Sequence, residues 1–146
     1  MTFGVFISMV WHSKLFWCLV LTYATAHIAK FITHRYRTKT WSFHTFIETG
    51  GMPSSHTATA TALCVGIAFE TAPSPLFFLA ALFTIITIRD SSGVRRSVSE
   101  QARMLNSLTS HMNLHKKVKI VLGHTPFQVF VGVLLGLVVS ISLYIF

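Results

Sequence analysis

Long apolar runs dominate the chain, and short polar segments between them hold most of its charge. Residues 127–146 contain no charged side chain, and residues 15–32 contain only Lys30. A helix needs ~20 mainly apolar residues to cross the hydrocarbon core of a bilayer. Both runs therefore predict membrane-spanning helices.

A third apolar stretch, residues 49–88, predicts two more spans. Its only charged residue is Glu70, and Pro73 and Pro75 follow closely. Because proline interrupts a helix interior, we expect the chain to turn here, with helices over about 55–69 and 76–88. Both are short for a full crossing, so we expect them to be shallow or to lean on neighbouring helices.

The polar segment 90–123 has a helical pattern of its own. Its apolar residues recur at steps of three or four residues, or simple multiples of them, with charged and polar residues between: Val94, Val98, Leu105, Leu108 and Met112. This predicts an amphipathic helix that lies at the membrane interface or caps the bundle.

The N-terminal residues indicate an interfacial lead-in to the first span, with Trp11 and Trp17 on either side of Lys14. No basic start precedes the apolar run and no small-residue cleavage site follows it, so we do not expect a secretory signal. The predicted fold is all-α: one polytopic transmembrane bundle over residues 1–146, with four or five membrane helices and one amphipathic interfacial helix.

Composition supports a membrane protein. Of 146 residues, 52% are hydrophobic and 11% are charged, against about 25% charged in soluble domains. Cys18 and Cys64 lie in apolar runs without metal-ligand spacing and are expected to act as small buried hydrophobes.

The net charge of +8 is concentrated on one side of the predicted membrane topology. Two explanations are compatible: the positive-inside rule, which makes this face cytoplasmic, and a site for an anionic substrate. Nucleic-acid binding is not expected, because the cations adjoin membrane segments instead of forming a basic soluble domain. Lys14 alone lies elsewhere, and the other eleven of the twelve Lys and Arg residues share this face: Lys30, Arg35, Arg37, Lys39, Arg89, Arg95, Arg96, Arg103, Lys116, Lys117 and Lys119.

The segment Gly-Gly-Met-Pro-Ser-Ser-His at residues 50–56 is a candidate anion site. Its glycines permit close backbone approach, and Ser54 and Ser55 are suited to cap the helix that follows. Free N–H groups at a helix N-terminus bind anions, and His56 would lie where it could protonate a leaving oxygen. The alternative is a glycine turn that opens a packing helix.

Three further clusters lie on the same predicted face. His124 and Gln128, four residues apart, share a helical face at the start of the last span. Arg95 and Arg96 suit phosphate oxygens, and Asp90 could hold one of them in place. Lys30 ends the first span, where a snorkelling side chain is the alternative. Together these clusters suit phosphoryl transfer, which needs charge stabilisation, a nucleophile and an acid. The few carboxylates form no metal-ligand pattern, so neither a metal nor another cofactor is expected.

Four motifs in order make the chain resemble the divergent type 2 phosphatidic acid phosphatase family, also labelled acid phosphatase/vanadium-dependent haloperoxidase-related. The resemblance covers about residues 26–136. The motifs are Gly-Gly-Met-Pro-Ser-Ser-His at 50–56, Asp-Ser-Ser-Gly-Val-Arg-Arg at 90–96, Gln101-Ala102 with Leu105-Asn106, and Gly-His-Thr-Pro at 123–126.

The resemblance implies a metal-independent phosphatase of membrane lipids that works through a phosphohistidine intermediate. It implies that His124 is the nucleophile and His56 the general acid, with Gln128 in the place of the superfamily's aspartate beside His124. Either the activity is then lower, or Asp90 or Glu100 supplies the missing charge. The residues that the resemblance assigns to the substrate phosphate are Lys30, Arg37, Ser54, Ser55, and Arg95 or Arg96.

The chain departs from the superfamily motifs at several positions. Thr38 replaces the proline of the first motif, Ser55 replaces the glycine of the second, and Gln128 replaces the aspartate that follows the nucleophilic histidine. A five-residue spacer normally separates the motif arginine from that histidine, whereas 27 residues separate Arg96 from His124. Glutamine can orient an imidazole but cannot stabilise its cation as a carboxylate does.

The expected substrate depends on which side of the membrane the site faces. A cytoplasmic site in a bacterial inner membrane, our first interpretation, favours phosphatidylglycerophosphate, whereas an outward site favours undecaprenyl diphosphate. A non-catalytic binder of anionic lipid that keeps the fold is a further alternative. Gly132 and Gly136 form a small-residue pair for packing against a neighbouring helix or a second copy, as in a homodimer.

Overall fold

The computed structural model describes residues 2–39, 51–112, 118, 120 and 123–146, which form helices without any strand. The prediction of an all-α fold is therefore confirmed. In chain order the helices are α1 Phe3–His12, α2 Lys14–Thr38, α3 Ser55–Thr71, α4 Pro75–Arg89, the π-helix η2 Asp90–Val94, α5 Arg95–His111 and α6 Pro126–Ile145.

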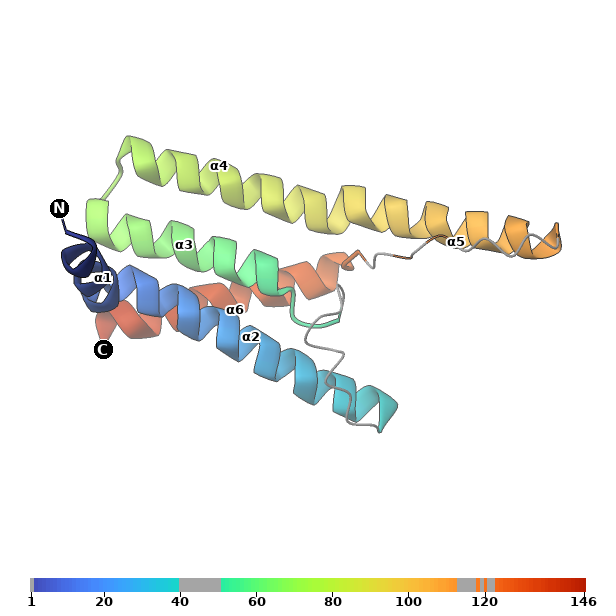
Figure 1. Ribbon diagram of the computed structural model, residues 1–146, viewed down its shortest axis with the longest axis horizontal. Helices are drawn as coiled ribbons and strands as arrows, with labels where there is room; N and C mark the ends of the chain where they lie inside the picture. Colours follow the sequence, from blue (N-terminus) through green and yellow to red (C-terminus); the bar gives the residue numbers. More distant parts are fainter. Residues whose placement is uncertain (1, 40–50, 113–117, 119, 121–122) are drawn as a thin grey trace.

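The four predicted spans correspond to α2, α3, α4 and α6 (Figure 1). Within the described residues, three helical stretches are long and apolar enough to cross a membrane: Lys14–Thr38, Pro75–His111 and Pro126–Ile145. Helix α3 has 17 residues and packs against α2, α4 and α6. The short central helix therefore leans on its neighbours, as its length predicts.

A side-chain hydroxyl caps the N-terminus of each of the four bundle helices. Ser13, Ser54 and Ser74 accept hydrogen bonds from backbone N–H groups of α2, α3 and α4. Thr125 and Gln128 form a reciprocal capping box at the start of α6. Such caps satisfy N–H groups that have no partner inside the helix, so these local signals fix where each helix begins.

Small residues bring α6 into close contact with α3. A Cβ atom added at Gly136 would overlap the Ala58 carbonyl oxygen, and one at Gly132 would lie 2.7 Å from the Ser54 carbonyl oxygen. The predicted glycine pair is thus buried against a neighbouring helix of the same chain and does not offer a surface to a second copy.

The amphipathic helix exists, but its position differs from the expected one. Helix α4, the π-helix and α5 continue along one axis, and α5 projects beyond the bundle instead of capping it (Figure 1). No proline interrupts residues 76–111. A π-helical turn accommodates an extra residue without ending a helix, so the chain continues through residues 90–94.

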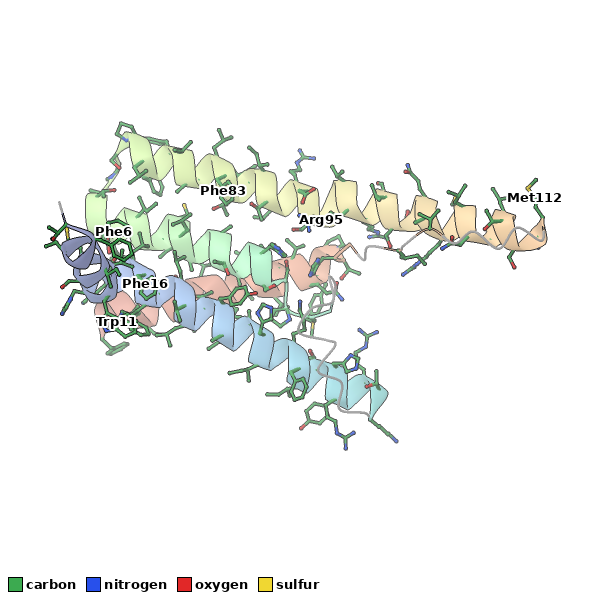
Figure 2. All side chains as sticks on the ribbon, in the orientation of Figure 1. Phe6, Trp11, Phe16, Phe83, Arg95 and Met112 are labelled. Atoms are coloured by element: carbon green, nitrogen blue, oxygen red, sulfur yellow. The ribbon has the colours of Figure 1, made fainter. Side chains whose placement is uncertain are left out.

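The N-terminal residues form an aromatic cluster at the end of the bundle remote from Arg95 (Figure 2). The Trp17 indole Nε1 donates to the Trp11 carbonyl oxygen at 2.9 Å, and the two rings meet edge to face. This cluster fixes the turn between α1 and α2. Indole rings favour the membrane–water interface, which agrees with the predicted lead-in.

Substituting alanine for Gly136 should destabilise the bundle, because the new methyl group would overlap the Ala58 carbonyl. Overpacking of this kind costs about 1–3 kcal/mol. We expect a lower midpoint of thermal unfolding in detergent. Gly4→Ala is the matched control, since no atom lies within 4 Å of its added Cβ. An equal midpoint for both variants would contradict the close packing.

Candidate functional site

Lys30 is buried beneath the loop that precedes α3. Its side chain is 4% exposed, although it carries an amino group near the end of an apolar span. Gly51 has a φ of +86°, and a Cβ there would lie 3.3 Å from Lys30 Cγ. The Thr33 hydroxyl donates to the Met52 carbonyl and ties this loop to α2. Lys30 is therefore enclosed by protein and does not snorkel to the surface.

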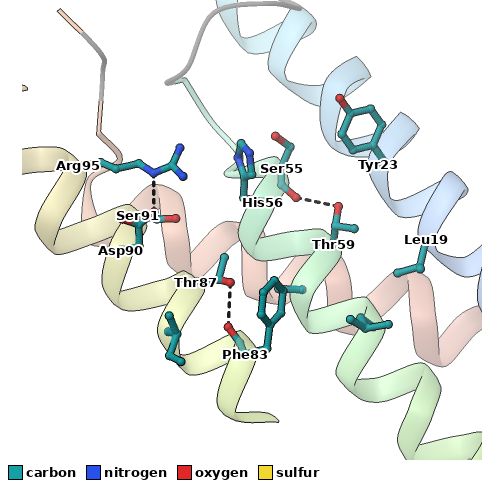
Figure 3. A pocket seen from close by; sticks show the side chains of 13 residues that line it. Leu19, Tyr23, Ser55, His56, Thr59, Phe83, Thr87, Asp90, Ser91 and Arg95 are labelled. Carbon is teal, nitrogen blue, oxygen red and sulfur yellow. Dashed lines mark hydrogen bonds and ion pairs between the residues drawn. The ribbon is translucent and has the colours of Figure 1, made fainter. Parts of the chain in front are cut away.

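The first turn of α3 brings His56 to the same end of the bundle. Ser54 is fully buried; its hydroxyl caps the helix, and its N–H donates to the Gln128 carbonyl at 3.2 Å. This bond joins the starts of α3 and α6. Ser55 is buried at the edge of a cavity, whereas His56 is exposed within it (Figure 3).

The π-helical turn between α4 and α5 supplies a basic group and a carboxylate. Arg95 Nε donates to Asp90 Oδ2, which turns the guanidinium toward the cavity (Figure 3). The Ser91 carbonyl accepts a hydrogen bond from the His124 backbone N–H at 3.1 Å. The segment that carries His124 is thereby attached to the turn that carries Arg95.

His124 is buried without a side-chain partner. The residue is 4% exposed, and neither ring nitrogen has a hydrogen-bond partner in the described part of the chain. Burial, and after it the nearby charges of Lys30, His56 and Arg95, together lower the pKa of His124 to about 4. At neutral pH its imidazole is therefore uncharged, with a free lone pair.

A cavity of about 490 Å³ lies between α2, α3 and α4. Most of its wall is apolar and includes Leu19, Leu63, Phe83 and Ile86, while His56, Asp90, Ser91 and Arg95 line one end (Figure 3). Phe83 and Ile86 are more than half exposed. The cavity therefore opens through the side of the bundle, at the level of the membrane helices.

Several predicted site residues meet at this end of the bundle. Lys30, His56 and Arg95 all lie near enough to His124 to affect its pKa. Asp90 holds Arg95, as the sequence predicts. Arg96 instead pairs with Glu100 at 3.1 Å and is exposed, whereas Arg95 lines the cavity.

Three predicted phosphate contacts, Lys30, Ser54 and Arg37, do not line the cavity, and neither does His124. Ser54 is committed to the helix cap. Arg37 is exposed, seven residues beyond Lys30 and thus about 10 Å further along α2. No contact described in the structure joins Arg37 to either histidine of the site.

Gln128 does not support His124 as predicted. Its side-chain oxygen accepts the Thr125 N–H at 3.0 Å and completes the capping box of α6. Asp90 is bound to Arg95, and both ring nitrogens of His124 lack a partner. Within the described residues, no carboxylate orients the imidazole. The reason is local, because a glutamine three residues after a capping threonine reaches back to the backbone of that threonine.

Two positioning contacts were not predicted. A Cβ at Gly123 would lie 2.4 Å from the Arg96 backbone nitrogen, so only glycine permits this approach. The glycine directly before His124 was a signal that could have suggested close packing. The Ser91 carbonyl that holds the His124 backbone left no such signal, since every residue has a carbonyl.

The charge distribution agrees with the predicted topology as far as it is described. Helices α2 and α4 end, and α3 and α6 begin, at the end of the bundle that holds the site (Figure 1). Of the nine described Lys and Arg residues, Lys14 alone lies at the opposite end. Lys116, Lys117 and Lys119 lie outside the described residues, as do Glu48 and Gly50.

Comparison with known proteins gives a family match over most of the chain. Residues 11–139 match the model of the Divergent PAP2 family. A relative in Bacillus subtilis strain 168, described as the uncharacterized membrane protein YuiD, is 41% identical over an alignment of 123 residues; the match covers 73% of this chain and 77% of that protein. No solved structure gives a significant match.

The family match covers the loop before α3, the π-helical turn and the segment that carries His124. These three segments lie at the same end of the bundle. On the strength of that match, the chain belongs to the Divergent PAP2 family of membrane proteins.

Proposed function

We propose that this protein hydrolyses the phosphate ester of a membrane lipid, with His124 as the nucleophile. One observation carries the proposal: a buried, uncharged imidazole with two unpartnered nitrogens lies among Lys30, Arg95 and His56. A buried polar group without a partner costs about 1–3 kcal/mol, so such a group in a folded protein calls for a functional explanation. Family membership supports a phosphatase-related role.

The proposed reaction has two steps. A ring nitrogen of His124 attacks phosphorus, the bond between phosphorus and the lipid oxygen breaks, and His56 gives a proton to the departing alcohol. Water then attacks the phosphohistidine while His56 takes back a proton, and inorganic phosphate leaves. Histidine suits both roles, since it acts as a nucleophile when neutral and exchanges protons near neutral pH.

Lys30 and Arg95 would stabilise the negative charge of the transferring phosphoryl group. Burial of Lys30 and the Asp90–Arg95 ion pair hold both cations in place before substrate arrives. Preorganised charges in a site shielded from water stabilise developing charge more strongly than mobile surface charges do. The N-terminus of α3, next to His56, adds backbone N–H groups that favour an anion.

The lateral cavity supports a lipid as the substrate. Its apolar wall suits a hydrocarbon chain, and its polar end places the attached phosphate near His56 and Arg95. The wall opens between α2 and α4, so a lipid would enter from the bilayer without leaving its apolar surroundings. A soluble phosphate ester would use only the polar end.

The concentration of cations at the site's end of the bundle favours a cytoplasmic orientation under the positive-inside rule. On that face of a bacterial inner membrane, phosphatidylglycerophosphate is the preferred substrate. Undecaprenyl diphosphate is the alternative for the opposite orientation. Hydrolysis of both lipids in vesicles of known protein orientation distinguishes the two.

The capping role of Gln128 favours one alternative function. Without a carboxylate on His124, the site would bind a lipid phosphate without cleaving it. Lipid binding without phosphate release by the purified protein would support this second function over the first.

Alanine substitutions of the two histidines should affect the hydrolysis rate differently, depending on the leaving group of the substrate. His124→Ala should abolish phosphate release from both phosphatidylglycerophosphate and p-nitrophenyl phosphate. His56→Ala should slow lipid hydrolysis about 10²–10⁴-fold, the usual contribution of a general acid. It should slow p-nitrophenyl phosphate hydrolysis much less, because nitrophenolate leaves without a proton.

His12→Ala, at the opposite end of the bundle, is the matched control and should keep full activity. Undiminished turnover in His124→Ala would exclude the proposed nucleophile. Equal losses of His56→Ala on both substrates would exclude its role as an acid.

Filling the cavity should affect lipid substrates selectively. Leu63→Trp places a large ring on the cavity wall, and we expect KM for a long-chain lipid phosphate to rise at least several-fold while p-nitrophenyl phosphate hydrolysis stays the same. Leu134→Trp, at an exposed position on α6, is the control. Unchanged lipid kinetics in Leu63→Trp would show that the substrate chain lies elsewhere.

The pH dependence of stability should reveal the neutral state of His124. Its pKa is about 4 in the folded protein and about 6.5 when unfolded, so only the unfolded chain gains this proton between those values. Stability should therefore fall as pH drops from about 6.5 toward 4, by at most about 3 kcal/mol. Thermal unfolding of His124→Gln should lack this component, and an identical pH profile would contradict a buried neutral imidazole.

A further inference from the structure

Helix α5 carries an apolar seam that is exposed in the part of the chain that the structure describes. Val94, Val98, Leu105, Leu108 and Met112 are each 48% or more exposed, although α5 projects away from the bundle (Figures 1 and 2). An apolar seam of this kind gains no stability if it faces water. The seam therefore indicates a partner surface.

The seam follows a seven-residue repeat. With Gln101 included, positions 94, 98, 101, 105, 108 and 112 alternate steps of four and three residues, which is the a/d pattern of a left-handed coiled coil. Val98, Leu105 and Met112 occupy a positions, and Val94, Gln101 and Leu108 occupy d positions. Val98 at an a position and Leu108 at a d position fit the preference of two-stranded coiled coils for a β-branched residue at a and leucine at d.

The charges of α5 lie away from this seam. Arg96 and Arg103 occupy f positions, on the side of the helix farthest from the seam, and Glu100 occupies a c position. The e and g positions, which flank the seam, carry no acidic residue, and Arg95 is the only Lys or Arg among them. The Arg95 guanidinium is bound to Asp90 and lines the cavity. A second copy would therefore meet an uncharged seam without repulsion.

The same distribution argues against a lipid surface as the partner. An interfacial helix keeps its cations along the flanks of the apolar face, where they reach the headgroups. Here Arg96 and Arg103 lie on the far side of the helix. With the seam against a membrane, both would point away from it.

The described contact of Val118 with α5 lies away from the seam. Asn106 donates from Nδ2 to the Val118 carbonyl at 2.9 Å and accepts the Val118 N–H at 2.8 Å. Ser99 and Ala102, the buried residues of α5, lie on this side of the helix. Position 106 is a b position, so the contact lies outside the a/d face.

We propose that a second copy of this chain binds the α5 seam to form a parallel two-stranded coiled coil. Because α5 continues the membrane-spanning α4, two copies with the same membrane orientation present their seams in parallel. Because both copies lie at the same depth, Gln101 of one copy lies opposite Gln101 of the other. The two side-chain amides then hydrogen-bond to each other. Membrane tethering raises the effective concentration of the partner and offsets the short length of the seam.

The proposed dimer has a direct structural link to His124. The coiled coil begins at Val94, inside the π-helical turn whose Ser91 carbonyl holds the His124 backbone. Pairing of α5 would therefore restrict the turn that positions both Arg95 and His124. This proposal stands on the seam alone and does not depend on the proposed phosphatase activity.

Cysteine cross-linking in membrane vesicles tests the proposal. Leu108→Cys, at a d position, should give a disulfide-linked dimer under mild oxidation, several-fold above the background from native Cys18 and Cys64. Ser107→Cys is the matched control. Ser107 is adjacent to Leu108 and is also exposed, but it occupies a c position on the outer side of the helix. Equal cross-linking of the two variants, or none with Leu108→Cys, would overturn the parallel pairing.

A second experiment measures association without cysteine chemistry. The double variant Leu105→Asp/Leu108→Asp should be monomeric in mild detergent by light scattering, whereas wild type and Ser107→Asp should be dimeric. Its unfolding midpoint should match wild type, since the seam lies outside the bundle. A monomeric wild type would overturn the proposal.

Spin labels separate a second copy from a lipid surface. A nitroxide at Leu108 in vesicles should show strong spin–spin coupling, because paired coiled-coil helices lie about 8–10 Å apart. Contact with lipid-soluble oxygen and no coupling would show that the seam lies on the membrane instead.

Discussion

The site depends on the attachment of the segment before α6 to the π-helical turn after α4. The His124 N–H donates to the Ser91 carbonyl, and Gly123 lies against the Arg96 backbone where no larger residue fits. These backbone contacts join parts of the chain about thirty residues apart in sequence. They bury His124 beside Arg95, and without them the histidine would lie in an exposed loop with an ordinary pKa. Arg95 and His124 therefore lie near each other although the short spacer of the superfamily motif is absent.

This attachment also explains the electrostatic state of the site. Burial keeps the His124 imidazole neutral, and the surrounding cations oppose its protonation. Cations that disfavour an imidazolium favour a bound phosphate, because they supply the opposite charge. The same groups thus keep the proposed nucleophile reactive and attract the substrate. In the proposed reaction Lys30 contributes to this charge although it is enclosed by the loop at Gly51.

The sequence predicted the membrane helices well, because apolar runs, prolines and capping residues are local signals. It also predicted that Lys30, His56 and His124 share one face, since helix direction follows from the number of spans. It could not distinguish Arg95 from Arg96, which depends on the π-helical turn, or predict that α5 would extend α4. It also could not predict that the Gln128 side chain would bind the Thr125 backbone, a local capping bond that competes with any bond to His124. The structure also places Gly136 inside the bundle and leaves the α5 seam exposed, which moves the proposed dimer contact from α6 to α5.

Trapping the covalent intermediate tests the central claim most directly. Protein mixed with lipid phosphate carrying ³²P should be quenched in alkali, where phosphohistidine survives, and digested for mass spectrometry. The account predicts a phosphoryl group on the peptide that contains His124 and none on peptides with other histidines. Label on a different residue, or turnover without any labelled protein, would contradict His124 as the nucleophile.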